Sequence, residues 1–185
     1  MIELELEKTY LAKYLPADLQ NCRSELLHNL YIPEGAEHPV LRIRKRGDRH
    51  EMTKKIPVSG NDSSRQLEHT IQLSPQEYES LMQCQGKSAA KRRYYCNLGG
   101  YEAELDVYLE GLTGLVVIDF EFKSDELMTA FTAPDICLAD VTQDAFTAGG
   151  VMAGKTFSDM APQLRQKYGY EPLYMQITDD DRMEK

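Results

Sequence analysis

Residues 1–11 read MIELELEKTYL, and this stretch decides how the rest of the chain is interpreted. Glu3, Glu5 and Glu7 alternate with apolar residues. Because the side chains of a strand alternate between its two faces, we predict a strand with one acidic and one apolar face. Three neighbouring carboxylates repel one another, so we expect a cation or basic side chains to face them. For this stretch alone, a solvated strand face is the simpler interpretation.

The same alternation recurs along the chain, with basic residues as often as acidic ones. The further predicted strands are residues 27–32, 40–46, 50–56, 65–73, 89–97, 101–109 and 115–122. Turn signals such as Gly47-Asp48 and Gly99-Gly100 join several of them, which is typical of antiparallel pairing. Helices are predicted at residues 74–83, 124–131 and 151–168, the last of which Pro162 can interrupt, and residues 17–27 are a short helix or a turn.

Nearly every predicted strand carries charge on one face and apolar residues on the other. Burying such charged faces singly would be very costly. A closed barrel solves this conflict if its interior is a wet, charged tunnel and its apolar outer face is partly covered by helices. We therefore predict an α+β fold of seven or eight antiparallel strands closed into a barrel with flanking helices.

The overall composition sets limits on organisation and partners. With 185 residues and a hydrophobic fraction of 42%, residues 1–185 are expected to form one domain, with residues 178–185 as a disordered, charged tail. The net charge of −9 makes nucleic acid an unlikely partner. No apolar run approaches a membrane span, and no signal pattern opens the chain, so we expect no membrane and a cytoplasmic location. Four scattered cysteines, without a CxxC, indicate buried free thiols.

Two sets of charged residues carry the predicted chemistry. Arginine and lysine provide donors that match phosphate oxygens, and carboxylates without His or Cys suit Mg²⁺ or Mn²⁺. Polyphosphate chemistry needs both kinds of group. The alternative is that the two sets pair with each other as surface ion pairs. The basic set is Arg42, Arg44, Lys55, Lys91 and Arg93; the acidic set is Glu3, Glu5, Glu7, Glu104, Asp106, Asp119 and Glu121.

Six short motifs in order give the chain a resemblance to a known family. They are Glu5–Leu11 (ELEKTYL), Leu41–Arg44 (LRIR), Met52–Lys55 (MTKK), Lys91–Tyr94 (KRRY), Glu104–Tyr108 (ELDVY) and Gly114–Phe122 (GLVVIDFEF). Together they resemble the CYTH superfamily, the triphosphate tunnel metalloenzymes, over residues 1–144. The family fold is an eight-stranded antiparallel β-barrel that forms a triphosphate tunnel. Its members include class IV adenylate cyclases, thiamine triphosphatases and inorganic triphosphatases.

The resemblance implies roles for named residues. Glu5, Glu7, Asp119 and Glu121 are expected to bind Mg²⁺ or Mn²⁺. Triphosphate is expected to be bound by Arg42, Arg44, Lys55, Lys91 and Arg93, with Glu104 and Asp106 as supporting acidic residues. Glu5, Glu7 and Lys55 are the expected catalytic residues.

Two positions depart from the family pattern. The family signature is ExExK, but Thr9 stands where the lysine belongs, and Lys8 is expected to point to the outer face. Residues 146–150 (FTAGG) replace a segment that often contains Tyr and Asn, and this change bears on how one end of the tunnel is closed.

The sequence therefore predicts a metal-dependent triphosphatase of a small molecule that carries a triphosphate, inorganic or organic. One alternative is an adenylate cyclase. Another is a module that binds polyphosphate or nucleotide without turnover, because Thr9 replaces the signature lysine. The expected partner is a small-molecule triphosphate or nucleotide, and the chain is expected to be a monomer or a homodimer.

Overall fold

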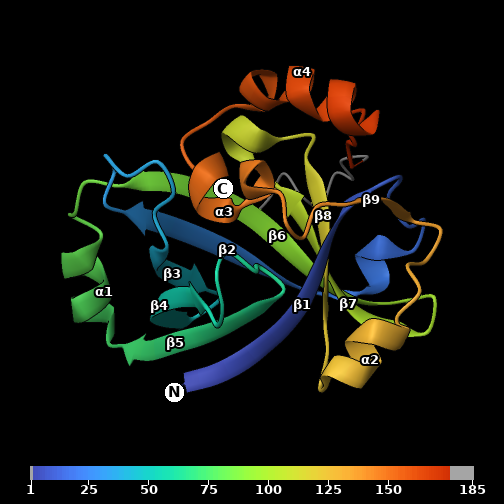
Figure 1. The fold of residues 1–185 in the computed structure, drawn as a ribbon. Helices are drawn as coiled ribbons and strands as arrows, with labels where there is room; N and C mark the ends of the chain where they lie inside the picture. The colour runs from blue at the N-terminus through green and yellow to red at the C-terminus, as the bar shows by residue number, and fades with distance from the viewer. Residues whose placement is uncertain (1, 176–185) are drawn as a thin grey trace.

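The computed structural model describes residues 2–175, and in this part the strands form a single antiparallel sheet (Figure 1). The strands are β1 (Ile2–Ala12), β2 (Arg23–Ile32), β3 (Leu41–Arg46), β4 (Arg49–Pro57), β5 (Arg65–Leu73), β6 (Lys87–Leu98), β7 (Tyr101–Tyr108), β8 (Val116–Glu121) and β9 (Cys137–Asp140). The predicted tail at residues 178–185 lies outside the described residues.

Strand β1 closes the sheet into a barrel. The neighbours run in the order β5-β4-β3-β2-β6-β7-β8-β1, and β1 then pairs with β5. Residues 2–6 of β1 pair with β5, and residues 7–11 pair with β8 on its other side. The predicted eight-stranded antiparallel barrel is confirmed. The short β9 was not predicted; it adds to the end of β1 beyond the point where β5 leaves it.

The helical segments lie outside the barrel wall or over its end (Figure 1). They are α1 (Pro75–Leu81), α2 (Asp125–Ala130), α3 (Gly149–Met152) and α4 (Phe157–Tyr168), with the 3-10 turns η1 (Leu19–Asn21), η2 (Glu110–Leu112) and η3 (Ala145–Thr147). The predicted capping box at Ser74 and Glu77 is present at the start of α1. No helix in the described part of the chain is both long and apolar enough to span a membrane.

Two predicted helical segments are shorter than expected, and the cysteines are less buried. The short helix or turn predicted within residues 17–27 is present as η1, which covers only Leu19–Asn21 because β2 already begins at Arg23. The C-terminal helix is interrupted before Pro162, which lies inside α4: Gly154 has a φ of 78°, and Thr156 starts α4 with its own capping box. All four cysteines are free, as predicted, but only Cys96 is buried; Cys22 and Cys137 are partly buried and Cys84 is exposed.

The outer face of half the barrel packs against the flanking segments, as predicted. Tyr10 and Phe120 from the wall contact Phe131 at the end of α2, with ring centroids 6.0 Å and 4.7 Å from the Phe131 centroid. These rings belong to a buried apolar cluster that also includes Leu105 and Ile118. Apolar packing therefore stabilises the wall from outside and leaves the inner face of the strands to polar side chains.

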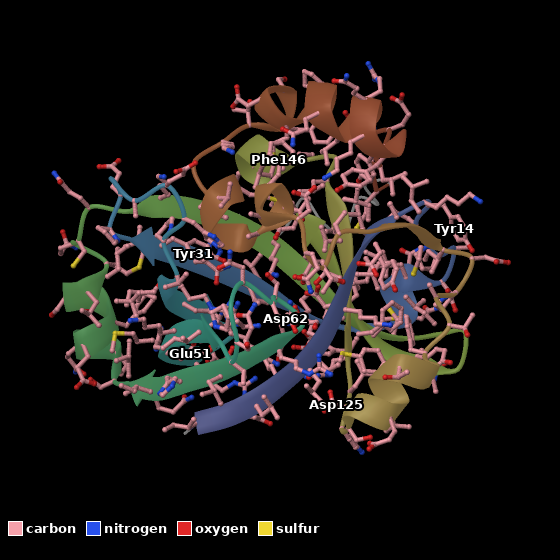
Figure 2. All side chains as sticks on the ribbon, in the orientation of Figure 1. Tyr14, Tyr31, Glu51, Asp62, Asp125 and Phe146 are labelled. Atoms are coloured by element: carbon pink, nitrogen blue, oxygen red, sulfur yellow. The ribbon has the colours of Figure 1, made fainter. Side chains whose placement is uncertain are left out.

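One end of the barrel is sealed by the segment that departs from the family pattern. Tyr31 from β2 and Leu11 from β1 pack there with Met152 of α3 in a second apolar cluster. In Figure 2, Tyr31 lies beside α3. A Cβ on Gly149 would come within 2.3 Å of the Tyr31 hydroxyl, and a Cβ on Gly150 within 2.1 Å of the Pro39 carbonyl oxygen. The two glycines let α3 lie directly on this end, which we call the capped end.

We expect Gly150→Ala to destabilise the fold by about 1–3 kcal/mol, because the new methyl group would overlap a backbone oxygen that cannot move independently. Gly35→Ala is the matched control, since a Cβ there meets nothing within 4 Å. The midpoints of urea unfolding measure both effects. Equal midpoints for the two variants would show that α3 does not seal the barrel as described.

Candidate active site

The inner faces of the strands bring the predicted acidic and basic residues together. The period-two pattern places Glu5 and Glu7 on the inner face of β1, and Glu121 of β8 is the cross-strand partner of Glu7. The other predicted site residues occupy the inner faces of β3, β4, β6, β7 and β8, and several of them form ion pairs with one another or with Glu5 inside the barrel. They are Arg42, Arg44, Lys55, Lys91, Arg93, Glu104, Asp106 and Asp119.

Three carboxylates form a cluster that could hold a metal ion. One oxygen from each of Glu5, Glu7 and Glu121 lies within 4.8 Å of the other two. Lys55 reaches this cluster from β4, with Nζ 2.5 Å from Glu5 Oε2 and 3.7 Å from Glu7 Oε2. A single ammonium therefore faces three carboxylates, and the cluster keeps an excess of negative charge.

The pKa values reflect this excess. Burial raises the pKa of Glu5 to about 7, and the charges of Glu7 and Glu68 act in the same direction against the opposing effect of Lys55. Burial and the charge of Glu7 also raise the pKa of Glu121. The pKa of Glu7 is lowered despite its burial, because Lys55 and Arg93 stabilise its ionised form. A cluster of carboxylate oxygens whose negative charge is only partly neutralised is suited to bind a hard divalent cation.

Asp119 lies apart from this three-carboxylate cluster. Its Oδ2 accepts a bond from Arg93 Nη2 at 3.2 Å, and its Oδ1 accepts one from the Thr9 hydroxyl at 2.9 Å. Arg93 also makes two bonds of 2.7 Å to Asp106 and pairs with Glu104. Asp119 is therefore placed to orient Arg93. It is also linked to the cluster, because the Thr9 hydroxyl lies within hydrogen-bond distance of both Asp119 and Glu7. Its role as a metal ligand stays a prediction.

The basic side chains are only partly neutralised. Arg42 pairs with Glu68 at 3.3 Å, yet its Nε is buried without a hydrogen-bond partner among the described residues. Arg44 donates from Nε to the Asn29 side chain at 2.8 Å and faces Glu51 at 3.5 Å. A buried guanidinium N–H group without an acceptor lowers the stability of the fold. A phosphate oxygen bound in the tunnel could accept a hydrogen bond from this group.

Sequence reasoning missed several polar residues of the tunnel, among them three that contact its basic side chains. Asn29 and Glu51 hold Arg44, and Glu68 faces both Arg42 and Lys55, its Oε2 lying 3.8 Å from Lys55 Nζ. The alternation already placed Glu51 beside Lys55 and set Glu68 opposite apolar residues. That signal could have identified both, whereas Asn29 has no charge and gives a weaker one.

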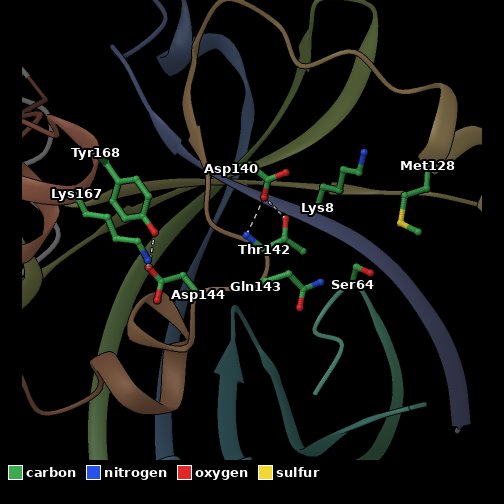
Figure 3. A pocket seen from close by; sticks show the side chains of 9 residues that line it. All are labelled: Lys8, Ser64, Met128, Asp140, Thr142, Gln143, Asp144, Lys167 and Tyr168. Atoms are coloured by element: carbon green, nitrogen blue, oxygen red, sulfur yellow. Dashed lines mark hydrogen bonds and ion pairs between the residues drawn. The ribbon is translucent and has the colours of Figure 1, made fainter. Parts of the chain in front are cut away.

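Thr9 and Lys8 point to opposite sides of β1, as predicted. The Thr9 hydroxyl lies 2.9 Å from Asp119 Oδ1 and 3.3 Å from Glu7 Oε1, inside the tunnel. Lys8 lines a pocket of about 510 Å³ outside the barrel, together with Asp140 and Thr142 (Figure 3). The Thr142 hydroxyl accepts a hydrogen bond of 3.0 Å from the Thr9 backbone N–H. No lysine therefore takes the place of the signature lysine from within β1.

The metal-free protein should become less stable as the pH rises from about 5 to about 7. Burial raises the pKa values of Glu5 and Asp119 to about 7, so in this interval the folded state binds more protons than the unfolded state. Glu7 and Asp106 have lowered pKa values, so their ionised carboxylates stabilise the fold throughout this interval. That contribution is lost only at lower pH, where they become protonated.

Urea unfolding in EDTA at pH 5.5, 6.5 and 7.5 tests this slope. Asp119→Asn should flatten it, and Asp125→Asn, on the outside of the barrel, should leave it unchanged. A metal-free wild type whose stability rises with pH over this interval would rule out the charge excess described here.

Comparisons with known proteins agree with this geometry. The chain is 30% identical over 142 residues to an inorganic triphosphatase of Nitrosomonas europaea, and the match covers 76% of this chain and 90% of that protein. The crystal structure of an inorganic triphosphatase superposes with a TM-score of 0.59 and 25% identity, over 82% of this chain and 95% of the other.

A putative adenylate cyclase from Bacillus halodurans shares the fold, with a TM-score of 0.52 and 13% identity over 100% of this chain and 99% of the other. No protein-family model matches the chain. The inorganic triphosphatase relative is matched over nearly its whole length, and the barrel has the expected closed topology. The chain therefore belongs to the CYTH superfamily, the triphosphate tunnel metalloenzymes.

Proposed function

We propose that the protein hydrolyses inorganic triphosphate inside the barrel, with Mg²⁺ or Mn²⁺ as cofactor. The observation that carries this proposal is that one tunnel contains both a cluster of carboxylates with excess negative charge and a buried arginine N–H group without an acceptor. Glu5, Glu7 and Glu121 share the single ammonium group of Lys55, and the buried Arg42 Nε has no hydrogen-bond acceptor among the described residues. A triphosphate bound with a divalent cation would satisfy both. The inorganic triphosphatase of Nitrosomonas europaea supports the choice of substrate.

The cluster of Glu5, Glu7 and Glu121 is the proposed metal site. Its donors are all carboxylate oxygens, which suit Mg²⁺ and Mn²⁺ better than softer ions. Such a cation polarises phosphate oxygens and neutralises charge that develops on the transferred phosphoryl group.

The basic residues of the tunnel are proposed to hold the substrate. Arg42 and Arg44 come from β3, and Lys91 and Arg93 from β6, so they approach a bound chain of phosphates from two strands of the wall. Arginine can bind phosphate oxygens through two N–H groups at once. Lys55 Nζ lies within 3.8 Å of carboxylate oxygens of Glu5, Glu7 and Glu68, and it is proposed to turn to a phosphate oxygen when a cation replaces it at the carboxylates.

Hydrolysis then needs only positioning and charge stabilisation. Water attacks the terminal phosphorus, and the bond from this phosphorus to the bridging oxygen breaks, which releases orthophosphate and pyrophosphate. Lys55 and the arginines stabilise the negative charge that the leaving oxygen gains. Glu5 and Glu7 would act by holding the cofactor beside the site of attack.

A panel of substrates with Mg²⁺ and with Mn²⁺ tests the proposal. Tripolyphosphate should release orthophosphate, and EDTA should abolish the release. Formation of cyclic AMP from ATP would instead favour the cyclase. Tight binding of tripolyphosphate with no release at any metal concentration would favour a binding module.

Thr9→Lys should raise the rate of tripolyphosphate hydrolysis by about one to two decades. A lysine there would add a charge-assisted contact beside Glu7 and Asp119, where Thr9 offers only a hydroxyl. Lys8→Gln, outside the tunnel, is the control and should not change the rate. Steady-state phosphate release at saturating metal gives the comparison. A slower Thr9→Lys enzyme would show that this tunnel is built around threonine.

A further inference from the structure

The end of the tunnel away from α3 carries a cluster of polar side chains that the proposed chemistry does not use. Strands β2 and β6 pair from Tyr31 and Lys87 near the capped end to Arg23 and Tyr95 at the other end. These positions are eight residues apart along β2, or roughly 26 Å. We call the group at this far end the rim cluster; it consists of Arg23, Glu25, Arg46, Arg49 and Tyr95.

The rim cluster continues the line of substrate-binding residues. Arg46 follows Arg44 by two residues on β3, and Tyr95 follows Arg93 by two residues on β6, so both lie on inner faces. Burial raises the pKa of Tyr95, and the positive charge of Arg93 is close enough to oppose this rise. A group attached to a triphosphate in the tunnel would therefore meet the rim cluster, because α3 closes the other end.

The partners of the rim cluster satisfy one another. The Glu25 carboxylate accepts hydrogen bonds from Arg46 Nε at 2.7 Å and from the Tyr95 hydroxyl at 2.8 Å. Arg23 and Arg49 each reach the same carboxylate, at 3.3 Å and 3.4 Å. Burial raises the pKa of Glu25, but the bonds from Arg46 and Tyr95 outweigh this and lower it to about 2. Glu25 thus stays ionised and holds the cluster together at neutral pH.

Arg23 also covers the ring of Tyr95. Its guanidinium carbon lies 3.7 Å from the ring centroid, a stacked cation–π contact. In the described part of the chain, the other tyrosines on the inner faces of the paired strands, Tyr31 and Tyr108, are buried in the apolar cluster under α3. Tyr95 is therefore the ring that a nucleobase or thiazolium group could stack on, and Arg23 occupies its face.

We propose that Arg23, by covering Tyr95, makes the tunnel select inorganic over organic triphosphates. The inference rests on the proposed function and names the residue that limits its substrate class. An organic group at the rim would have to displace Arg23 from Tyr95. Inorganic triphosphate has no such group and leaves the rim cluster intact.

The test compares Arg23→Ala with Arg49→Ala. Both variants remove one exposed arginine from Glu25, but Arg23 also stacks on the Tyr95 ring, with its guanidinium carbon 3.7 Å from the centroid, against 5.7 Å for Arg46. Isothermal titration with methylene-bridged analogues of tripolyphosphate and of ATP, which cannot be hydrolysed at the bridge, each with Mn²⁺, gives the two dissociation constants for each variant. Arg23→Ala should tighten ATP binding about 10-fold, as expected for a base that gains an aromatic platform, and change tripolyphosphate binding by less than about 3-fold. Arg49→Ala should leave the ratio of the two constants at its wild-type value.

A second change removes the platform itself. Adding Tyr95→Leu to Arg23→Ala should return ATP binding to the wild-type value. An unchanged ratio in Arg23→Ala, or an equal gain in Arg49→Ala, would overturn the role of Arg23. Because the readout is binding, these results stand apart from turnover: a wild type that binds tripolyphosphate but never hydrolyses it defeats the proposed function and leaves this test intact. A wild type that binds neither ligand overturns both.

Discussion

Glu5→Gln combined with Glu7→Gln should abolish hydrolysis of tripolyphosphate, with a loss of at least about 10²–10³-fold in kcat/KM. Both side chains belong to the three-carboxylate cluster, and the amides that replace them carry no charge for a divalent cation. Mn²⁺ binding in the presence of tripolyphosphate, measured by isothermal titration, should be lost in parallel.

The fold should survive this double substitution. The two carboxylates repel each other, and the pKa of Glu5 shows that burial already disfavours its charge. Lys55 keeps Glu68 as a neighbour at 3.8 Å. Glu3→Gln is the matched control, because it removes a charge from the same strand outside the cluster. If the double variant bound Mn²⁺ as the wild type does, the metal would lie elsewhere.

Arg42→Gln should weaken tripolyphosphate binding by about one to two decades, the effect expected from losing a charge-assisted contact in a buried site. Arg42 is chosen because its Nε has no hydrogen-bond acceptor among the described residues, and because its ion-pair partner Glu68 keeps a hydrogen bond of 2.7 Å from the Thr70 hydroxyl when Arg42 is removed. The shift of the melting temperature by tripolyphosphate should shrink accordingly, since a ligand stabilises the folded state in proportion to its occupancy.

Lys45→Gln serves as the control for Arg42→Gln. It removes one positive charge from the same strand, β3, but Lys45 is exposed and lies on the outer face. Equal losses of binding in the two variants would mean that only the overall charge of the protein matters, and the assignment of Arg42 to the tunnel would be wrong.

The alternation of side chains allowed the sequence to predict much of the barrel and of the site. A period of two identifies which residues share a face, so Glu5 with Glu7, and Arg42 with Arg44, could be grouped by their spacing alone. The charge on one face of nearly every strand then predicted a tunnel, and the motifs of the resemblance assigned metal and phosphate binding to its residues. The capping box at Ser74 was equally visible, because it depends on residues three apart.

Register, pairing and end closure could not be predicted in this way. A face pattern does not show that Lys55 reaches Glu5 or that Asp119 bonds to Arg93, since these contacts depend on which residues lie opposite across strands far apart in sequence. The four-residue β9 is too short for a periodic signal. The role of Gly149 appears only when α3 is placed against Tyr31.

The most direct test of the central claim is a crystal structure of the wild type with Mn²⁺ and a methylene-bridged triphosphate, which cannot be hydrolysed at the bridge. The anomalous signal of manganese locates the ion independently of the protein density. We expect manganese among the oxygens of Glu5, Glu7 and Glu121, with the phosphates against Arg42, Arg44, Lys91 and Arg93. Manganese bound away from these three carboxylates, or a triphosphate bound outside the barrel, would contradict the account.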